Sequence, residues 1–178
     1  MLFKFRIISD EVKDFAREIV AGEKNTFLDL HTAIQHDLDY DPNQLASFFL
    51  TNQQWEKELE ITLIDMMDEN ADNCITMDEA GLGEFLCNAG DRMLYVYDFF
   101  SERAFFIELT EIIKNEEKKI KPKVVFHNGK PPVQTELGLD LDIDPGTSLL
   151  DDPDNDTGNS DNEDLTDDSI DPDNVSDE

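Results

Sequence analysis

Three histidines, His31, His36 and His127, are the side chains of this sequence that could hold a metal ion. A helical metal site needs two ligands on one face, which a spacing of four residues provides. His31 and His36 are five residues apart, so their side chains point about 140° apart around a helix. No cysteine or glutamate completes a recognisable ligand set. We therefore expect no metal site and no cofactor, and we interpret these histidines as helix-surface or interfacial residues.

The remaining reactive residues do not form a catalytic pattern. Cys74 and Cys87 are thirteen residues apart, a spacing that fits neither a metal site nor a redox motif, so we expect reduced packing residues in a cytosolic protein. The sequence contains no nucleophile-elbow motif and no Cys–His signature. Gly81 and Gly83 lack the other glycines of a phosphate-binding loop. We expect a protein that is not an enzyme and has no catalytic residues.

Two polar features remain as candidate functional surfaces. Asp98 lies between aromatic residues, where it either bonds the N–H groups of a turn or reaches a site; the local preference of aspartate favours the turn. Lys118 and Lys119 belong to the basic run of residues 114–123. This run either contacts phosphates or forms a solvated edge that the acidic C-terminal part screens.

The elements that position these residues follow from hydrophobic spacing. Residues 91–112 predict a central hairpin with a turn at 101–103, because apolar residues alternate along both halves. On one face of this hairpin we place Met93, Tyr95, Tyr97, Phe99, Phe105, Ile107 and Leu109. Similar alternation predicts strands over residues 2–8, 14–21, 45–50, 59–63 and 123–127, the first two of which pair with each other.

Two capping patterns predict two helices. Thr26 and Asp29 form the first pattern, and apolar residues then repeat at helical steps, so we expect a helix over residues 26–37. Thr76 and Glu79 form the second pattern and predict a helix that continues through Phe85. The fold class that follows is α+β, an antiparallel sheet with two packed helices.

Charge divides the chain into two parts. Its net charge is −29, of which −12 falls in residues 1–130 and −17 in residues 131–178, where no lysine or arginine occurs. We expect a folded domain over residues 1–134 and an acidic, mostly disordered tail over residues 135–178, since the tail has too few apolar residues to offset its ordering entropy. Such a charge repels phosphates and anionic membranes and attracts basic partners.

Other features of the sequence concern localisation and cations. No apolar run approaches the roughly 20 residues that span a bilayer, and the N-terminus lacks a signal peptide's apolar core, so we expect a cytoplasmic protein. Asp152, Asp154, Asp156 and Glu163 match a calcium-loop spacing. Thr157 stands where that loop requires glycine, so we expect only weak, non-specific cation binding.

Several of these segments resemble the plasmid pRiA4b ORF-3-like family from about Phe3 to Pro132. The resemblance implies an α+β fold and an association with plasmids and mobile elements, and it implies no particular activity. The segments that carry it are the helix FLDLHTAIQ, the strand QLASFF, the motif YVYDF and a late Gly-x-Pro-Pro. The matching residues are Phe27, Leu30, His31, Ile34, Gln35, Leu45, Phe48, Tyr95, Tyr97, Asp98, Phe99, Pro131 and Pro132.

The sequence departs from the family's pattern at several polar positions. The family's hairpin motif runs Tyr-x-Tyr-Asp-Phe-Gly-Asp-x-Trp-x-His, but here Phe100 and Ser101 replace Gly-Asp and Phe105 replaces the histidine, with Arg103 in place of the tryptophan. Gln44 stands where a histidine is common. Val133 and Gln134 stand where Glu-Asp follows the two prolines. If the family has a polar site built from these residues, this member has lost most of it.

These observations leave three functional hypotheses. We favour a non-enzymatic interaction module whose acidic tail contacts a basic protein. The first alternative is a nucleic-acid-associated protein of plasmid or mobile-element origin, in which the lysine run contacts phosphates. The second is a degenerate enzyme, which predicts an enclosed pocket near Tyr97, Asp98 and His31. The candidate functional surface comprises His31, Tyr95, Tyr97, Asp98, Lys118 and Lys119. We expect no membrane partner, and the sequence indicates no oligomeric state.

Overall fold

The computed structural model describes residues 1–65, 74–114 and 120–135, all within one compact unit, Met1–Gly138. Within these ranges, eight strands form one sheet in the order β5-β4-β3-β6-β7-β1-β2-β8. All pairs are antiparallel except β4 with β5. The strands are β1 (Leu2–Ile8), β2 (Ala16–Gly22), β3 (Ser47–Thr51), β4 (Lys57–Thr62), β5 (Ile75–Thr76), β6 (Arg92–Asp98), β7 (Arg103–Ile113) and β8 (Lys123–Asn128). The predicted α+β fold with an antiparallel sheet is confirmed for these residues, and the predicted disorder of residues 135–178 lies outside them from residue 136 onward.

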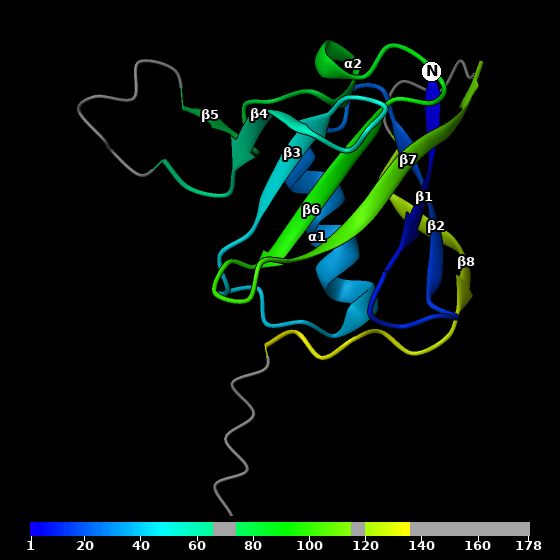
Figure 1. Ribbon diagram of the computed structural model, residues 1–178. Coiled ribbons are helices and arrows are strands. Elements are labelled where there is room, and N and C mark those ends of the chain that lie inside the picture. The colour runs from blue at the N-terminus through cyan, green and yellow to red at the C-terminus, as the bar shows by residue number, and fades with distance from the viewer. Residues whose placement is uncertain (66–73, 115–119, 136–178) are drawn as a thin grey trace, which may run out of the picture. The chain divides into compact units, whose positions relative to one another are not determined.

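The β6–β7 hairpin lies in the interior of the sheet (Figure 1). β6 pairs with β3 on its other side, and β7 pairs with β1. The predicted hairpin is thus confirmed, and its aromatic strand is not an edge. One detail was wrong: Phe99 does not share the buried face of Tyr95 and Tyr97, because β6 ends at Asp98 and the turn begins with Phe99.

Helix α1 (Phe27–Leu38) covers one face of the sheet (Figure 1). Its predicted capping box is confirmed: the Asp29 N–H donates to Thr26 Oγ1 and the Thr26 N–H donates to Asp29 Oδ2, both at 3.2 Å. These bonds satisfy donors that the first turn of a helix otherwise leaves free. The apolar side of α1 is buried through Phe27, Leu30 and Ile34. Sequence patterning and the cap therefore define this helix to within a residue at each end.

The second helix begins later than predicted. α2 (Leu82–Phe85) is a single turn, and its N-cap residue is Gly81 rather than Thr76. Thr76 instead ends β5, which pairs with β4 through Thr62, and the Met77 N–H donates to the Thr62 carbonyl at 2.8 Å. The backbone at Thr76 and Met77 is therefore hydrogen-bonded to β4 and does not begin the helix that the capping pattern predicted. Among the described residues, no helix is both long and apolar enough to span a membrane.

The sheet also presents an apolar row on the face opposite α1, which we call the open face. Cross-strand pairing joins Phe49 to Leu94, Leu94 to Phe106 and Phe106 to Ile8. Side chains alternate along each strand, so these residues point away from the core that packs on α1. The open face consists of Ile8, Phe49, Leu94, Val96 and Phe106. Leu94 and Val96 are buried, although no described helix lies on this face.

Candidate functional site

A buried polar network joins α1 to the centre of the sheet. His31 and Gln35 are one turn apart on α1, and both approach Tyr95 on β6. Gln35 Nε2 donates to the Tyr95 hydroxyl oxygen at 2.6 Å, and that hydroxyl lies 2.8 Å from His31 Nδ1. The Tyr95 hydroxyl donates to Nδ1 or accepts from it, depending on which ring nitrogen of His31 carries the proton.

Burial fixes the protonation of this network. It lowers the pKa of His31 to about 4, because removal from water disfavours the charged imidazolium. It also raises the pKa of Tyr95 above its ordinary value. Gln35 Oε1 is buried and has no hydrogen-bond partner in the described part of the chain. The network is thus a neutral contact that joins α1 to the sheet, and of the two expected positions, helix surface or interface, His31 lies at the interface.

The other two histidines are not part of this network. His36 is exposed on α1 and His127 is exposed on β8, so the expected divergence of His31 and His36 around the helix is confirmed. Across the described ranges, no three side chains of His, Cys, Asp or Glu come together as a metal-binding group. Cys74 and Cys87 are both free thiols.

A second cluster surrounds Tyr97, which lies on the same buried face of β6 as Tyr95 but two residues closer to the hairpin turn. The Tyr97 hydroxyl donates to Glu11 Oε1 at 3.2 Å, and Arg103 Nε donates to the same oxygen at 2.7 Å. A second Arg103 nitrogen donates to Glu11 Oε2. These bonds and the guanidinium charge hold the pKa of Glu11 below its ordinary value. The cluster borders an open hollow of about 640 Å³ lined by Glu11, Val12, Ser101, Arg103, Pro131, Pro132 and Val133.

Three of the positions that depart from the family pattern, Ser101, Arg103 and Val133, line this hollow. The Tyr40 ring packs against the rings of Tyr97 and Phe105, with centroids 5.6 and 6.3 Å away. The Tyr40 hydroxyl donates to the Pro132 carbonyl at 2.6 Å. One residue further on, the Asp41 N–H donates to the side chain of Gln134 at 2.7 Å. Aromatic packing and two hydrogen bonds therefore hold Tyr40 and Asp41 against the hairpin and the segment of Pro132 and Gln134.

Asp98 holds the hairpin turn, as the local preference of aspartate predicted. Its Oδ1 accepts from the N–H groups of Phe100 and Ser101 at 3.0 and 3.2 Å. The side chain is buried between the turn and the sheet. These two bonds account for its position without any ligand, and they keep Phe99 and Phe100 in the turn.

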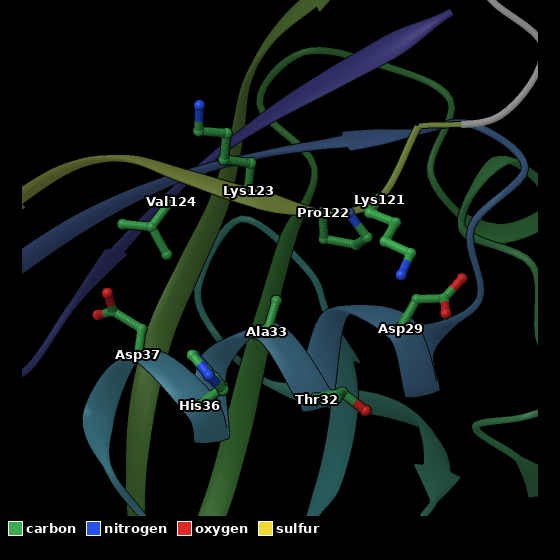
Figure 2. Close-up of a pocket in the computed structure, with 9 residues that line it drawn as sticks. All are labelled: Asp29, Thr32, Ala33, His36, Asp37, Lys121, Pro122, Lys123 and Val124. Atoms are coloured by element: carbon green, nitrogen blue, oxygen red, sulfur yellow. The ribbon is translucent and has the colours of Figure 1, made fainter.

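A second hollow, of about 510 Å³, lies between α1 and β8 (Figure 2). Its walls carry both charges, since Asp29 and Asp37 come from α1 and Lys121 and Lys123 from the segment that enters β8. Asp37 Oδ2 accepts from Arg17 Nε at 2.6 Å. Lys121 points toward Asp29 in Figure 2, whereas Lys123 points away from the helix. The predicted residues Lys118 and Lys119 lie outside the described residues.

An apolar hollow of about 260 Å³ opens on the side of the sheet that carries the open face. It is lined by Leu45, Ala46, Ser47, Glu60, Thr62, Leu63, Ile64 and Phe99. Its rim consists of Leu45, Ile64 and Phe99, which are 47, 49 and 46% exposed. Next to Phe99, Phe100 is 86% exposed. Exposed apolar groups gathered in one hollow are typical of interaction surfaces.

The structure brings together some of the predicted site residues and separates others. His31 and Tyr95 form one buried pair, while Tyr97 and Asp98 lie at the hairpin end beside Glu11 and the turn. None of the three hollows described above is lined by any of these four side chains. Sequence reasoning missed the apolar hollow. Its one signal was the Phe99–Phe100 pair at a turn, where polar residues are usual.

Comparisons with known proteins agree with this fold. The described architecture, a largely antiparallel sheet with a helix across one face, defines an α+β protein. The family model described as plasmid pRiA4b ORF-3-like protein matches residues 3–177. This chain therefore belongs to the plasmid pRiA4b ORF-3-like family, as the resemblance predicted. This match extends beyond Pro132, the residue at which the predicted resemblance ended.

A solved structure with a similar fold is the crystal structure of a protein of unknown function, MM3350, from Methanosarcina mazei Go1, with a TM-score of 0.56 and 23% sequence identity. The similarity covers 71% of this chain and 68% of that one. No curated protein matches the chain.

Proposed function

We propose that this chain is a non-enzymatic interaction module that binds a basic protein partner. The observation that carries the proposal is an exposed apolar hollow on a chain with a net charge of −29. Apolar side chains that remain half exposed on a folded surface gain free energy when a partner covers them. The surrounding negative charge speeds encounters with positively charged proteins and disfavours other partners.

The acidic residues of the C-terminal part supply most of the long-range attraction in this proposal. Residues 131–178 carry −17 without a single lysine or arginine. Exposed charges act over about 10 Å at ordinary salt, so their contribution falls as salt rises. The apolar contact does not fall with salt in this way. The two contributions are therefore separable by experiment.

Affinity capture from a nuclease-treated native lysate tests the proposal. The full chain is compared with a variant in which every Asp and Glu of residues 139–178 becomes Asn or Gln, at low and high salt. We expect a basic protein to be retained by the full chain and to be retained less by the neutralised variant, most clearly at low salt. Equal retention by both proteins at both salt concentrations would contradict a role for the acidic tail.

Association with nucleic acid is the second candidate function. It is supported by Lys121 and Lys123, which are exposed beside the hollow of Figure 2. Asp29 and Asp37 on the opposite wall and the −12 of residues 1–130 oppose phosphate binding there. The changes Lys121→Gln and Lys123→Gln test it. A phosphate-binding surface predicts that these changes reduce DNA or RNA retardation at low salt, whereas no retardation by the unchanged protein removes this candidate.

The hypothesis of a degenerate enzyme predicts an enclosed pocket near Tyr97, Asp98 and His31. None of the hollows described above is lined by these side chains, and the hollow beside Tyr97 is open rather than enclosed. Its charged side chains are Glu11 and Arg103, an ion pair in which both carboxylate oxygens of Glu11 are bonded. We propose that any former activity of this region is lost in the present chain.

A further inference from the structure

The apolar hollow continues into the open face of the sheet. Ser47 pairs with Thr62 on one side and with Val96 on the other. Ser47 and Thr62 line the hollow, so its floor leads directly to Val96 and from there to Leu94. The far end of the open face is already covered, because the Trp55 ring packs edge-on against Phe106 with centroids 5.0 Å apart. The part left available for a partner is therefore the end that holds the hollow.

We propose that this hollow is the docking site for a short basic amphipathic segment of a partner protein. In this complex, apolar side chains of the segment enter between the rim residues Leu45, Ile64 and Phe99. Its lysines or arginines face the acidic side chains around the hollow, Glu58, Glu60 and Glu102. The inference rests on the proposed function and specifies which surface acts and what chemistry the partner brings.

The size and lining of the hollow favour a side chain of a protein over a small metabolite. Its volume, about 260 Å³, lies below the roughly 300–1,000 Å³ typical of small-molecule sites. Apart from Ser47, Thr62 and Glu60 its lining is apolar. Sugars, nucleotides and other polar ligands would leave their own groups without partners there. A single leucine-like side chain of a peptide is small enough for this volume and has no polar group that would lose its partners.

Charge identifies the partner as basic. Glu60 lines the hollow, and Glu58 lies two residues away on the same face of β4; both side chains are exposed. Glu102 is exposed in the turn that carries Phe99 and Phe100. A second copy of this chain would bring the same acids and a net charge of −29 to the contact. Like charges across an interface are costly, so a basic segment is favoured over self-association.

A fluorescence anisotropy titration with three labelled peptides tests the docking site on the full chain. The probe is an amphipathic peptide of leucine and lysine. In one reference peptide serine replaces each leucine, and in the other glutamate replaces each lysine. We expect the leucine–lysine peptide to bind at least tenfold more tightly than either reference, because the contact needs both apolar burial and positive charge.

The chain offers matched control positions for the site. Phe99→Ser removes a rim side chain that is 46% exposed, and Phe126→Ser removes one on edge strand β8 that is 49% exposed. Ile64→Ser and Val125→Ser form a second pair, at 49 and 51%. We expect each hollow variant to weaken peptide binding about tenfold, the effect of one large apolar side chain. Each β8 variant should change it less than twofold.

Other outcomes overturn the docking site in distinguishable ways. Equal affinities for Phe99→Ser and Phe126→Ser would do so, as would a tight complex with the leucine–glutamate peptide. Neutralising the acids of residues 139–178 could abolish peptide binding while Phe99→Ser leaves the affinity unchanged. In that case the docking site fails while the proposed function stands. If the full chain binds neither lysine peptide, both fail. If sedimentation shows that the chain forms a dimer and that Phe99→Ser abolishes it, the hollow binds a second copy of the chain instead.

Discussion

The burial of His31 predicts that the folded state loses stability in mild acid. Its pKa lies at about 4 in the folded chain, against an ordinary value of 6.5 that applies when the chain is unfolded. Between these values the unfolded state binds more protons, so the free energy of unfolding falls as the pH falls from 6.5 toward 4. The full difference corresponds to about 3 kcal/mol. Between pH 7.5 and pH 5 we expect a loss of about 2 kcal/mol from this group alone.

Urea unfolding of the full chain and of His31→Gln, followed by circular dichroism at several pH values, measures this loss. The two proteins share every carboxyl group and the exposed His36 and His127, so the difference between their pH profiles isolates His31. We expect the unchanged chain to lose stability more steeply between pH 7.5 and pH 5, while His31→Gln, less stable at pH 7.5, shows a shallower profile. Parallel profiles, or a steeper profile for the variant, would refute the assignment of His31 as a buried neutral imidazole.

Three further predictions concern polar contacts that hold the fold, each checked by urea unfolding at pH 7.5. Tyr95→Phe removes the hydroxyl between His31 and Gln35, and we expect it to cost about 1–3 kcal/mol because it leaves both of these buried groups without that partner; an unchanged midpoint would contradict the network. Thr26→Ala removes the acceptor of the α1 cap and should cost about 0.5–2 kcal/mol, whereas Thr26→Ser should cost less. Asp98→Ala removes the acceptor of two turn N–H groups and should cost about 1 kcal/mol; Asp98→Asn keeps an acceptor, so an equal loss in both variants would count against this role.

Alternation of apolar residues predicted most of the sheet because one face of each strand is buried. Phe3, Phe5 and Ile7 in β1 are buried in the core, whereas Lys4 between them is part exposed and Arg6 is exposed. The same rule predicted the β6–β7 hairpin and the pairing of β1 with β2. It cannot give the order of strands, since β1 lies between β7 and β2 through contacts about a hundred residues apart. Such long-range order depends on packing that no local pattern records.

Local capping chemistry predicted one helix and failed for the other, for a tertiary reason. Thr26 makes only an isolated bridge with Gly81, and its side-chain oxygen accepts from the Asp29 N–H to cap α1. Thr76 carries the same kind of pattern, but its backbone pairs with β4, and the next residue, Met77, is fully buried. Propensity is a weak preference that such contacts override. The helix therefore begins only at Leu82.

The candidate sites were less predictable than the fold. His31 and Tyr95 are 64 residues apart, so nothing in their local sequence indicates that they share a hydrogen bond. The apolar hollow combines three chain segments, those before β3, after β4 and after β6. In the sequence Leu45 and Ile64 look like ordinary strand residues. Only the fold shows that they remain half exposed around one cavity.

The measurement that tests the central claim most directly is a paired titration of the full chain at one moderate salt concentration. One titration uses the labelled leucine–lysine peptide, and the other uses a labelled DNA duplex. An interaction module for basic proteins predicts saturable binding of the peptide and no detectable binding of the duplex. Saturable binding of the duplex without binding of the peptide would contradict the account and assign the chain to nucleic acid instead.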